Sequence, residues 1–507
     1  MIDEVLSRIG FKTLENWMSG SLSEQIPVLD DLRAYEDSRR SGSNGVRYMA
    51  VRDAEGDRLL ILGSREGDGA VPATFVGTVR DEGNRRLMTA PQNGENARAL
   101  REHFPHTAPS TAGAHRRSFG LGDRLGLASP GHIPLFRDGE VVPVLAQQSL
   151  RELDLMGRDY TEVIDAASWA VFNTGFEGAW VADGDHLKSV DAVVSALKQG
   201  CTMITADLSD HLAFDYMDAD IQTVTSAYRH LDSGLRNNIE EKFSSDVRLA
   251  DGSVLVFDPE TRQRIALTYD RALDHAADLY QACRGVKREF DFEISIDETD
   301  LPTTPEAHYF VAKELLARGI SFSSLAPRFV GEFQKGIDYI GDVEEFASSF
   351  ALHALIAADM GYKISIHSSS DKFSVYPVIG SLVKGAYHLK TSGTNWLVAL
   401  ETISRINPIF FREIFTRAYD VFPAARSYYH ITPDMKLSTD ITTLEDSELP
   451  DVFANPTDRQ VLHVSYGELF KDAGLKAQFF QQIKKSIELY WNALKSHIGR
   501  HLELLEG

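Results

Sequence analysis

The sequence predicts an α/β fold: a (β/α)8 TIM-like barrel with a small N-terminal α+β subdomain and C-terminal helices. Two observations carry this prediction. Beyond about residue 115, short apolar runs alternate with longer amphipathic stretches, the pattern of repeated βα units and a parallel sheet. Before it, short alternating strands follow one another with only turns between them. We therefore expect two domains, residues 1–115 and residues 116–507.

The N-terminal subdomain is predicted from three alternating apolar stretches, at residues 46–53, 57–64 and 73–81. Turns that contain Gly and Asp separate these stretches, and a helical stretch follows around residues 96–103. Residues 105–117 are rich in Pro, Ser, Thr and Ala, which is the composition of a linker. The boundary between the two domains is therefore expected near residue 115.

Strand candidates after the linker come close to the number that an eight-fold barrel requires. They are residues 178–183, 201–207, 290–297, 320–326, 363–367, 386–391, 427–432 and 460–466. Helix-capping signals stand between several of them. Thr304 precedes Pro305, Asp342 precedes Glu345 by three residues, and Ser189 opens a helix that stops at Gly200. Residues 471–505 carry apolar residues at helical spacing and are expected to pack on the barrel exterior.

Composition and charge limit the classes of function. The chain has 507 residues, with Asp+Glu 74 against Lys+Arg 52 and a net charge of −22, which argues against nucleic acid or an anionic membrane as partner. The start of the chain lacks a basic and apolar signal, and no apolar run is long enough to span a bilayer. Two cysteines, Cys201 and Cys283, provide no disulfide framework. We expect a cytoplasmic protein outside the membrane.

Ligand-type and acid/base residues recur where the candidate strands end. The most informative case is residues 362–380, where an alternating strand runs into His367, Asp371 and Lys372. The carboxyl ends of barrel strands build one face, so such side chains can converge on one substrate. Other strands end in the same way, with Asp207, Asp210, His211, Glu293, Asp297, Glu298, His388 and Lys390.

Histidines that reach one point from different strands make a site for a divalent metal, since neutral imidazole supplies a lone pair without negative charge. We predict His211, His367 and His388 as the metal ligands; the residues do not distinguish Zn, Mn, Ni or Co. His388 also fits a hydrogen-bonded core position between apolar neighbours. His186, His430 and His463 lie in or beside candidate strands too, so the choice of converging histidines stays open at this point.

Carboxylates beside such a metal can move the proton of a sugar hydroxyl. Asp210 and Glu298 are the predicted catalytic pair. Asp297 is the alternative to Glu298, because the strand register decides which of two neighbours points inward. The choice between Asp207 and Asp210 also stays open at this point.

A glycine-rich segment at residues 118–132 differs from nucleotide-binding loops. Its glycines miss the dinucleotide spacing, no buried strand precedes it, and no Gly-Lys-Ser/Thr loop occurs in the chain. We read Arg124 in this segment as a possible partner for a substrate carboxylate.

Four segments together resemble the tagaturonate epimerase family: SFGLGDRLGLASPGH (118–132), TADLSDH (205–211), ISIDETD (294–300) and ISIHSSSDKFSVYP (364–377). The resemblance runs from Ser118 to the C-terminal helix. It implies a metal-dependent interconversion of D-tagaturonate and D-fructuronate in the cytoplasm. On matching positions it implies His211, His367 and His388 as metal ligands and Asp210 with Glu298 as the proton-transfer pair.

The chemistry of that substrate predicts retro-aldol cleavage and re-addition, because the inverted carbon is not acidified by the keto group. Transient oxidation would need a nicotinamide cofactor, for which the sequence has no motif. Arg124, Asp371 and Lys372 are the predicted substrate-binding residues, with Lys390 a further cation for the uronate carboxylate. A ketohexose 4-epimerase, a barrel glycoside hydrolase with paired carboxylates and a non-catalytic sugar-acid sensor are the alternatives. The sequence leaves the oligomeric state open.

Overall fold

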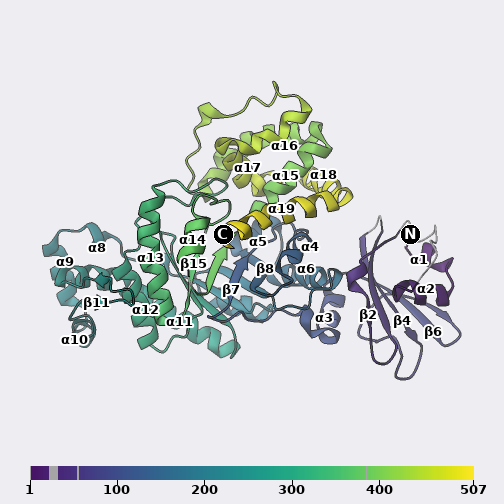
Figure 1. The fold of residues 1–507 in the computed structure, drawn as a ribbon, viewed down its shortest axis with the longest axis horizontal. Coiled ribbons are helices and arrows are strands. Elements are labelled where there is room, and N and C mark those ends of the chain that lie inside the picture. Colours follow the sequence, from purple (N-terminus) through teal and green to yellow (C-terminus); the bar gives the residue numbers. More distant parts are fainter. Residues whose placement is uncertain (1, 22–31, 54–55, 384, 392, 507) are drawn as a thin grey trace.

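The computed structural model describes residues 2–21, 32–53, 56–383, 385–391 and 393–506. Figure 1 shows three regions along the molecule: an N-terminal sheet at one end, a barrel with its helices in the middle, and a C-terminal helical layer that covers one side of the barrel. None of the helices in these ranges is both long and apolar enough to cross a membrane.

The predicted barrel is confirmed. Eight strands close a parallel barrel in the order β10-β13-β14-β15-β16-β7-β8-β9. They are β7 (Arg117–Gly120), β8 (Val141–Ser149), β9 (Val181–Leu187), β10 (Met203–Asp207), β13 (Asp291–Ile296), β14 (Ser324–Pro327), β15 (Lys363–Ile366) and β16 (Tyr387–Lys390). Every residue of β10, β13, β14, β15 and β16 is buried, as expected for strands covered on both faces.

Two of the predicted strands are wrong. Residues 460–466 belong to helix α17 (Pro456–Leu469). Residues 427–432 begin within a short 3₁₀ helix, η6 (Arg426–Tyr428), and continue as irregular backbone. The stretch 460–466 is buried on all sides, so its apolar pattern carries no period that separates helix from strand. The barrel instead closes through β7 and β8, which follow the linker directly; β7 is only four residues long and opens the glycine-rich segment.

Helices surround the barrel and begin where the sequence signals predicted. Thr304 Oγ1 accepts the backbone N–H of Ala307 at 3.1 Å and caps α12, and the Asp342 carboxylate caps α13. Ser189 caps α7 in the same way. The outer helices are α5 (Leu150–Met156), α6 (Tyr160–Asn173), α7 (Val190–Lys198), α11 (Pro259–Val286), α12 (Pro305–Ala317), α13 (Val343–Met360) and α14 (Tyr376–Leu382).

A small excursion between β10 and α11 contains α8 (Asp215–Asp218), α9 (Ile221–His230), α10 (Ser233–Lys242) and the hairpin β11 (Val247–Arg248) and β12 (Val254–Leu255). Figure 1 shows it at the end of the molecule opposite the N-terminal sheet.

The C-terminal layer has an apolar core of its own. Its helices are α15 (Thr394–Ile406), α16 (Pro408–Ala425), α17, α18 (Ala473–Lys485) and α19 (Ile487–Glu506). Trp396, Phe411 and Phe479 are fully buried within it. Residues 471–505 thus form two helices, and α19 continues from this core onto the barrel, where Ile498, Leu502 and Leu505 join the barrel core.

The N-terminal sheet is antiparallel, with strands β1 (Arg33–Ala34), β2 (Arg40–Ser41), β3 (Arg47–Asp53), β4 (Gly56–Ser64), β5 (Thr78–Glu82) and β6 (Arg85–Pro91). One face packs against α1 (Ile2–Ser7) and α2 (Phe11–Met18), and the other shares a core with α3 (Gly94–His103) and α6. Strand β6 was not predicted from the sequence. The division into two domains at residue 115 stays a prediction.

Candidate active site

A polar cavity of about 220 Å³ opens at the carboxyl ends of the barrel strands, where a barrel fold places its active site. Strands β8, β9, β10 and β16 and the segments that follow β13 and β15 contribute to its wall. A second cavity of about 630 Å³ adjoins it. The two share Arg151, Glu298, Lys335, His367 and Ser368.

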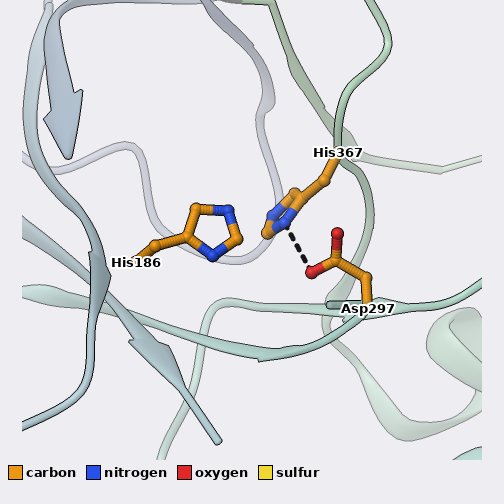
Figure 2. Close-up of side chains that lie close together, drawn as sticks. All are labelled: His186, Asp297 and His367. Carbon is orange, nitrogen blue, oxygen red and sulfur yellow. Dashed lines mark hydrogen bonds and ion pairs between the residues drawn. The ribbon is translucent and has the colours of Figure 1, made fainter. Parts of the chain in front are cut away.

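His186, Asp297 and His367 converge in this region (Figure 2). His186 comes from β9, Asp297 follows β13, and His367 follows β15. One ligand atom from each lies within 4.8 Å of the others, and His367 Nδ1 lies 2.9 Å from Asp297 Oδ1. Three strand ends thus bring two imidazoles and a carboxylate to one point.

His186 also approaches two further carboxylates. Its Nδ1 lies 3.4 Å from Asp207 Oδ2 and 3.9 Å from Glu298 Oε1. His186 Nδ1 and Asp207 Oδ2 are both buried, and neither makes a hydrogen bond. The backbone of His186 is left-handed, with φ of 53°, a conformation that is uncommon for residues other than glycine. Burial acts to lower its pKa, but the carboxylates of Asp185 and Glu298 raise the pKa of His186 to about 10.

A buried charge network forms the floor beneath these residues. Lys390 Nζ lies 2.6 Å from Asp185 Oδ1, 2.9 Å from Glu293 Oε1 and 3.0 Å from Asp183 Oδ2. Glu293 Oε1 in turn lies 2.8 Å from His367 Nε2. Both nitrogens of His367 therefore face carboxylates, which fixes the orientation of the ring.

The predicted metal triad is not brought together in the part of the chain that the structure describes. No close group of ligand atoms there contains His211 or His388. His211 ends the 3₁₀ helix η5 (Ser209–His211), and its ring stacks on His275 with centroids 3.9 Å apart. His388 is fully buried, its Nδ1 bonds Ser118 Oγ at 2.9 Å, and burial lowers its pKa to about 3.

The two residues of the predicted catalytic pair, Asp210 and Glu298, lie in different positions relative to the cavities. Glu298 lines both cavities and is half exposed. Asp210 lines neither, but its carboxylate accepts a hydrogen bond of 2.7 Å from Lys188 Nζ, and Lys188 lines the smaller cavity. Of the alternatives, Asp297 belongs to the His186 and His367 cluster, and Asp207 faces His186.

The three predicted substrate-binding residues line neither cavity. Arg124 is buried beside Glu152, with its Nε 2.8 Å from Glu152 Oε1. Asp371 pairs with Arg459 and His497, each at 2.7 Å. Lys372 donates hydrogen bonds to three backbone carbonyls, and burial lowers its pKa to about 7.

Several cavity residues were not predicted as site residues from the sequence, and His186, Arg151 and Lys335 are three of them. His186 was one of three further histidines; the strand there extends to Leu187, beyond the predicted end at residue 183. Arg151 lies at the start of α5, and Lys335 lies in the long connection between β14 and α13. Neither stands at a candidate strand end, so no local signal marked them.

Comparisons with known proteins agree on one family. A sequence model of the family described as tagaturonate epimerase matches residues 35–505. The tagaturonate/fructuronate epimerase of Thermotoga maritima is 39% identical over 477 residues, which cover 93% of this chain and 97% of that protein. The native crystal structure of a fructuronate-tagaturonate epimerase from Cohnella laeviribosi matches with a TM-score of 0.89 at 37% identity, covering 98% of this chain and 99% of that one. A complex of the Cohnella laeviribosi enzyme with one glycerol has a TM-score of 0.89 at 37% identity, with 97% of this chain and 98% of that chain covered.

Proposed function

Since this chain belongs to the tagaturonate epimerase family, we propose that it interconverts D-tagaturonate and D-fructuronate in the cavity at the top of its barrel. The observation that carries the proposal is the convergence of His186, Asp297 and His367 beside further carboxylates and cations. Cys201 and Cys283 are both free and buried, and we place the reaction in the reducing cytoplasm.

We further propose that the enzyme depends on a divalent metal held by His186, Asp297 and His367. Imidazole and carboxylate ligands suit Zn, Mn, Ni and Co alike. The fit is supported by the donor set, because two imidazoles and a carboxylate converge with their ligand atoms within 4.8 Å of one another. When bound, the metal would supply positive charge that stabilises oxygen anions of the substrate. Glu293 would hold His367 from its other nitrogen.

The reaction inverts C4 of a sugar acid whose keto group is C2 and whose carboxylate is C6. A carboxylate removes the proton of the C4 hydroxyl, the C3–C4 bond breaks, and its electron pair passes into the enediolate of the C1–C3 fragment. The aldehyde fragment, C4 to C6, turns its other face toward C3. The C3–C4 bond forms again, and the new C4 oxyanion takes up a proton.

Residues of the cavity wall can perform these proton transfers. We assign the removal of the hydroxyl proton to Glu298, whose only ion-pair contact among the described residues is His186 at 3.9 Å. Lys188 donates a proton to the C4 oxyanion once the C3–C4 bond has formed on the other face of the aldehyde. The Asp210 carboxylate holds the Lys188 ammonium group at 2.7 Å. Asp210 then acts through Lys188 as a positioning residue.

Metal dependence is tested by removing the metal with a chelator and adding back each of the four ions. Epimerisation of D-fructuronate, followed by chromatography, should stop on removal and return with at least one ion. Equal rates with and without chelator, in protein shown to be metal-free, would contradict the proposal.

The route is tested with D-fructuronate that carries deuterium at C4. Retro-aldol cleavage leaves the C4–D bond intact, so the product keeps its deuterium and the rate shows no primary isotope effect. Loss of the label to water would show direct deprotonation, and a primary isotope effect would show hydride transfer.

A further inference from the structure

Four cationic side chains line the smaller cavity, apart from its histidines, in the part of the chain that the structure describes: Arg151, Lys188, Lys335 and Lys390. Two of them already have carboxylate partners. Lys390 contacts three carboxylates within 3.0 Å, and Lys188 contacts Asp210 at 2.7 Å. The charges of these two side chains are neutralised by the protein itself.

Arg151 and Lys335 differ from the other two. Neither forms an ion pair with any carboxylate of the described residues. Arg151 Nη1 donates to the carbonyl oxygen of Tyr428 at 3.0 Å, and its guanidinium lies 4.7 Å from the ring centre of Tyr429. Lys335 Nζ donates to Ser368 Oγ at 3.0 Å. All three partners are neutral groups.

Two cations without a counter-charge are unexpected in this protein. The chain has a net charge of −22, with Asp+Glu 74 against Lys+Arg 52, so carboxylates are abundant. Burial lowers the pKa of Lys335, Glu152 and Glu298 act on it only from beyond ion-pair distance, and the positive charges of Arg124 and Arg151 repel it. Two repelling cations at one cavity favour an anion between them.

Their position suits the substrate. Arg151 and Lys335 line both adjoining cavities, as do Glu298 and His367. Lys335 bonds Ser368, the residue next to His367. In a uronate the carboxylate carbon lies only two bonds from the inverted C4, so a group that binds the carboxylate must stand close to the residues that act on C4.

We propose that Arg151 and Lys335 together bind the substrate carboxylate and set the preference of the enzyme for a uronate over a neutral ketohexose. This inference rests on the proposed function. The carboxylate receives charge-assisted hydrogen bonds from both side chains. A neutral ketohexose has a primary alcohol at the same carbon and leaves the two cations without an anion, so the same pair excludes it.

Kinetics on two substrates test the pair. Lys335→Met and Arg151→Met should each lower kcat/KM for D-fructuronate by about 100-fold, as expected for loss of a charged hydrogen bond, while kcat/KM for D-fructose stays the same or rises. Lys335→Arg should recover part of the loss. The matched control is Arg328→Met, because Arg328 lines the larger cavity and already has Glu332 at 3.6 Å. An equal loss for both substrates would overturn the proposal, since it would show a general structural role.

Binding provides a measurement that does not require turnover. Glycerate has the C4–C6 end of the substrate with its carboxylate, and glycerol is its neutral counterpart. Calorimetry on the metal-loaded enzyme should show glycerate binding at least about 10-fold more tightly than glycerol, with this difference lost in Lys335→Met and kept in Arg328→Met. Circular dichroism and urea unfolding confirm that each variant is folded.

The two proposals fail in different ways. If the wild-type enzyme converts no D-fructuronate but the glycerate preference depends on Lys335, the reaction is wrong and the carboxylate site stands. If the wild type converts D-fructuronate and glycerate binds wild type and Lys335→Met equally, the reaction stands and the carboxylate site is wrong.

Discussion

Asp371 ties the loop that follows β15 to two helices of the C-terminal layer. Its carboxylate pairs with Arg459 of α17 and with His497 of α19, each at 2.7 Å, and its backbone N–H donates to His501 Nε2 at 3.2 Å. The loop begins at His367, so this contact connects the C-terminal layer to the candidate metal site. We predict that Asp371→Asn lowers the free energy of unfolding by about 2–3 kcal/mol at pH 7.

The magnitude follows from the contacts. A charged contact is worth about 1 kcal/mol more than a neutral one, and the substitution removes the carboxylate charge from two ion pairs, of which the one with Arg459 is also a hydrogen bond. Removal of one partner of a fully buried pair costs about 3–5 kcal/mol, but the side chains of Arg459 and His497 remain 18% and 22% exposed, so water compensates part of the loss. Asp371 has φ of 61°, which asparagine also tolerates, so the backbone adds no strain.

The assay is urea unfolding of both proteins across pH. Burial alone would raise the pKa of Asp371, but the charges of His497 and Arg459 hold it well below its usual range. A lowered carboxyl pKa contributes stability that is full above the unfolded value of about 4 and is lost as the pH falls through the folded value. The difference between wild type and Asp371→Asn should therefore shrink below about pH 4. Equal urea midpoints at pH 7, or a difference that grows on acidification, would refute this reasoning.

Three further substitutions test the cavity and the packing around it. Glu298→Gln should lower kcat for D-fructuronate by about 100-fold or more with a small change in KM, and an unchanged kcat would remove Glu298 from proton transfer. Gly120→Ala places a Cβ 1.8 Å from Gln147 Oε1, the far end of a flexible side chain in the cavity wall. Because the amide can move away, the urea midpoint should stay close to wild type. The moved amide changes the cavity wall, so kcat/KM should fall about 10-fold. Gly380→Ala places a Cβ 2.0 Å from the backbone carbonyl oxygen of Leu505, so the backbone must shift. Urea unfolding should show a free energy of unfolding lower by about 1–3 kcal/mol, and the folded enzyme should keep its activity.

Local sequence signals were sufficient for much of the fold. Six of the eight barrel strands lie where alternating or continuous apolar runs predicted them, and the helix that starts after Thr304 begins at its capping residue. These signals are readable because a strand covered on both faces must be apolar and a helix start must satisfy its free N–H groups within a few residues. His367 and Glu298 line the cavity, and their places after strands could be predicted for the same reason, since strand ends are local features.

Convergence of side chains was decided by the tertiary structure. His186 joins His367, whereas His211 turns in a 3₁₀ helix onto His275, and no sequence pattern separates the two. The charges of Arg124 and Asp371 are neutralised by residues 28 and 88 positions away, Glu152 and Arg459.

The physical reason is the range of the interactions involved. Secondary structure depends on neighbours within one or two turns, whereas a shared site depends on strand register and barrel closure, where a shift of one residue turns a side chain to the opposite face. Sequence patterns were therefore sufficient for six barrel strands and for the residue types at their carboxyl ends, whereas the closure of the barrel through β7 and β8 and the meeting of the site residues depend on the tertiary structure.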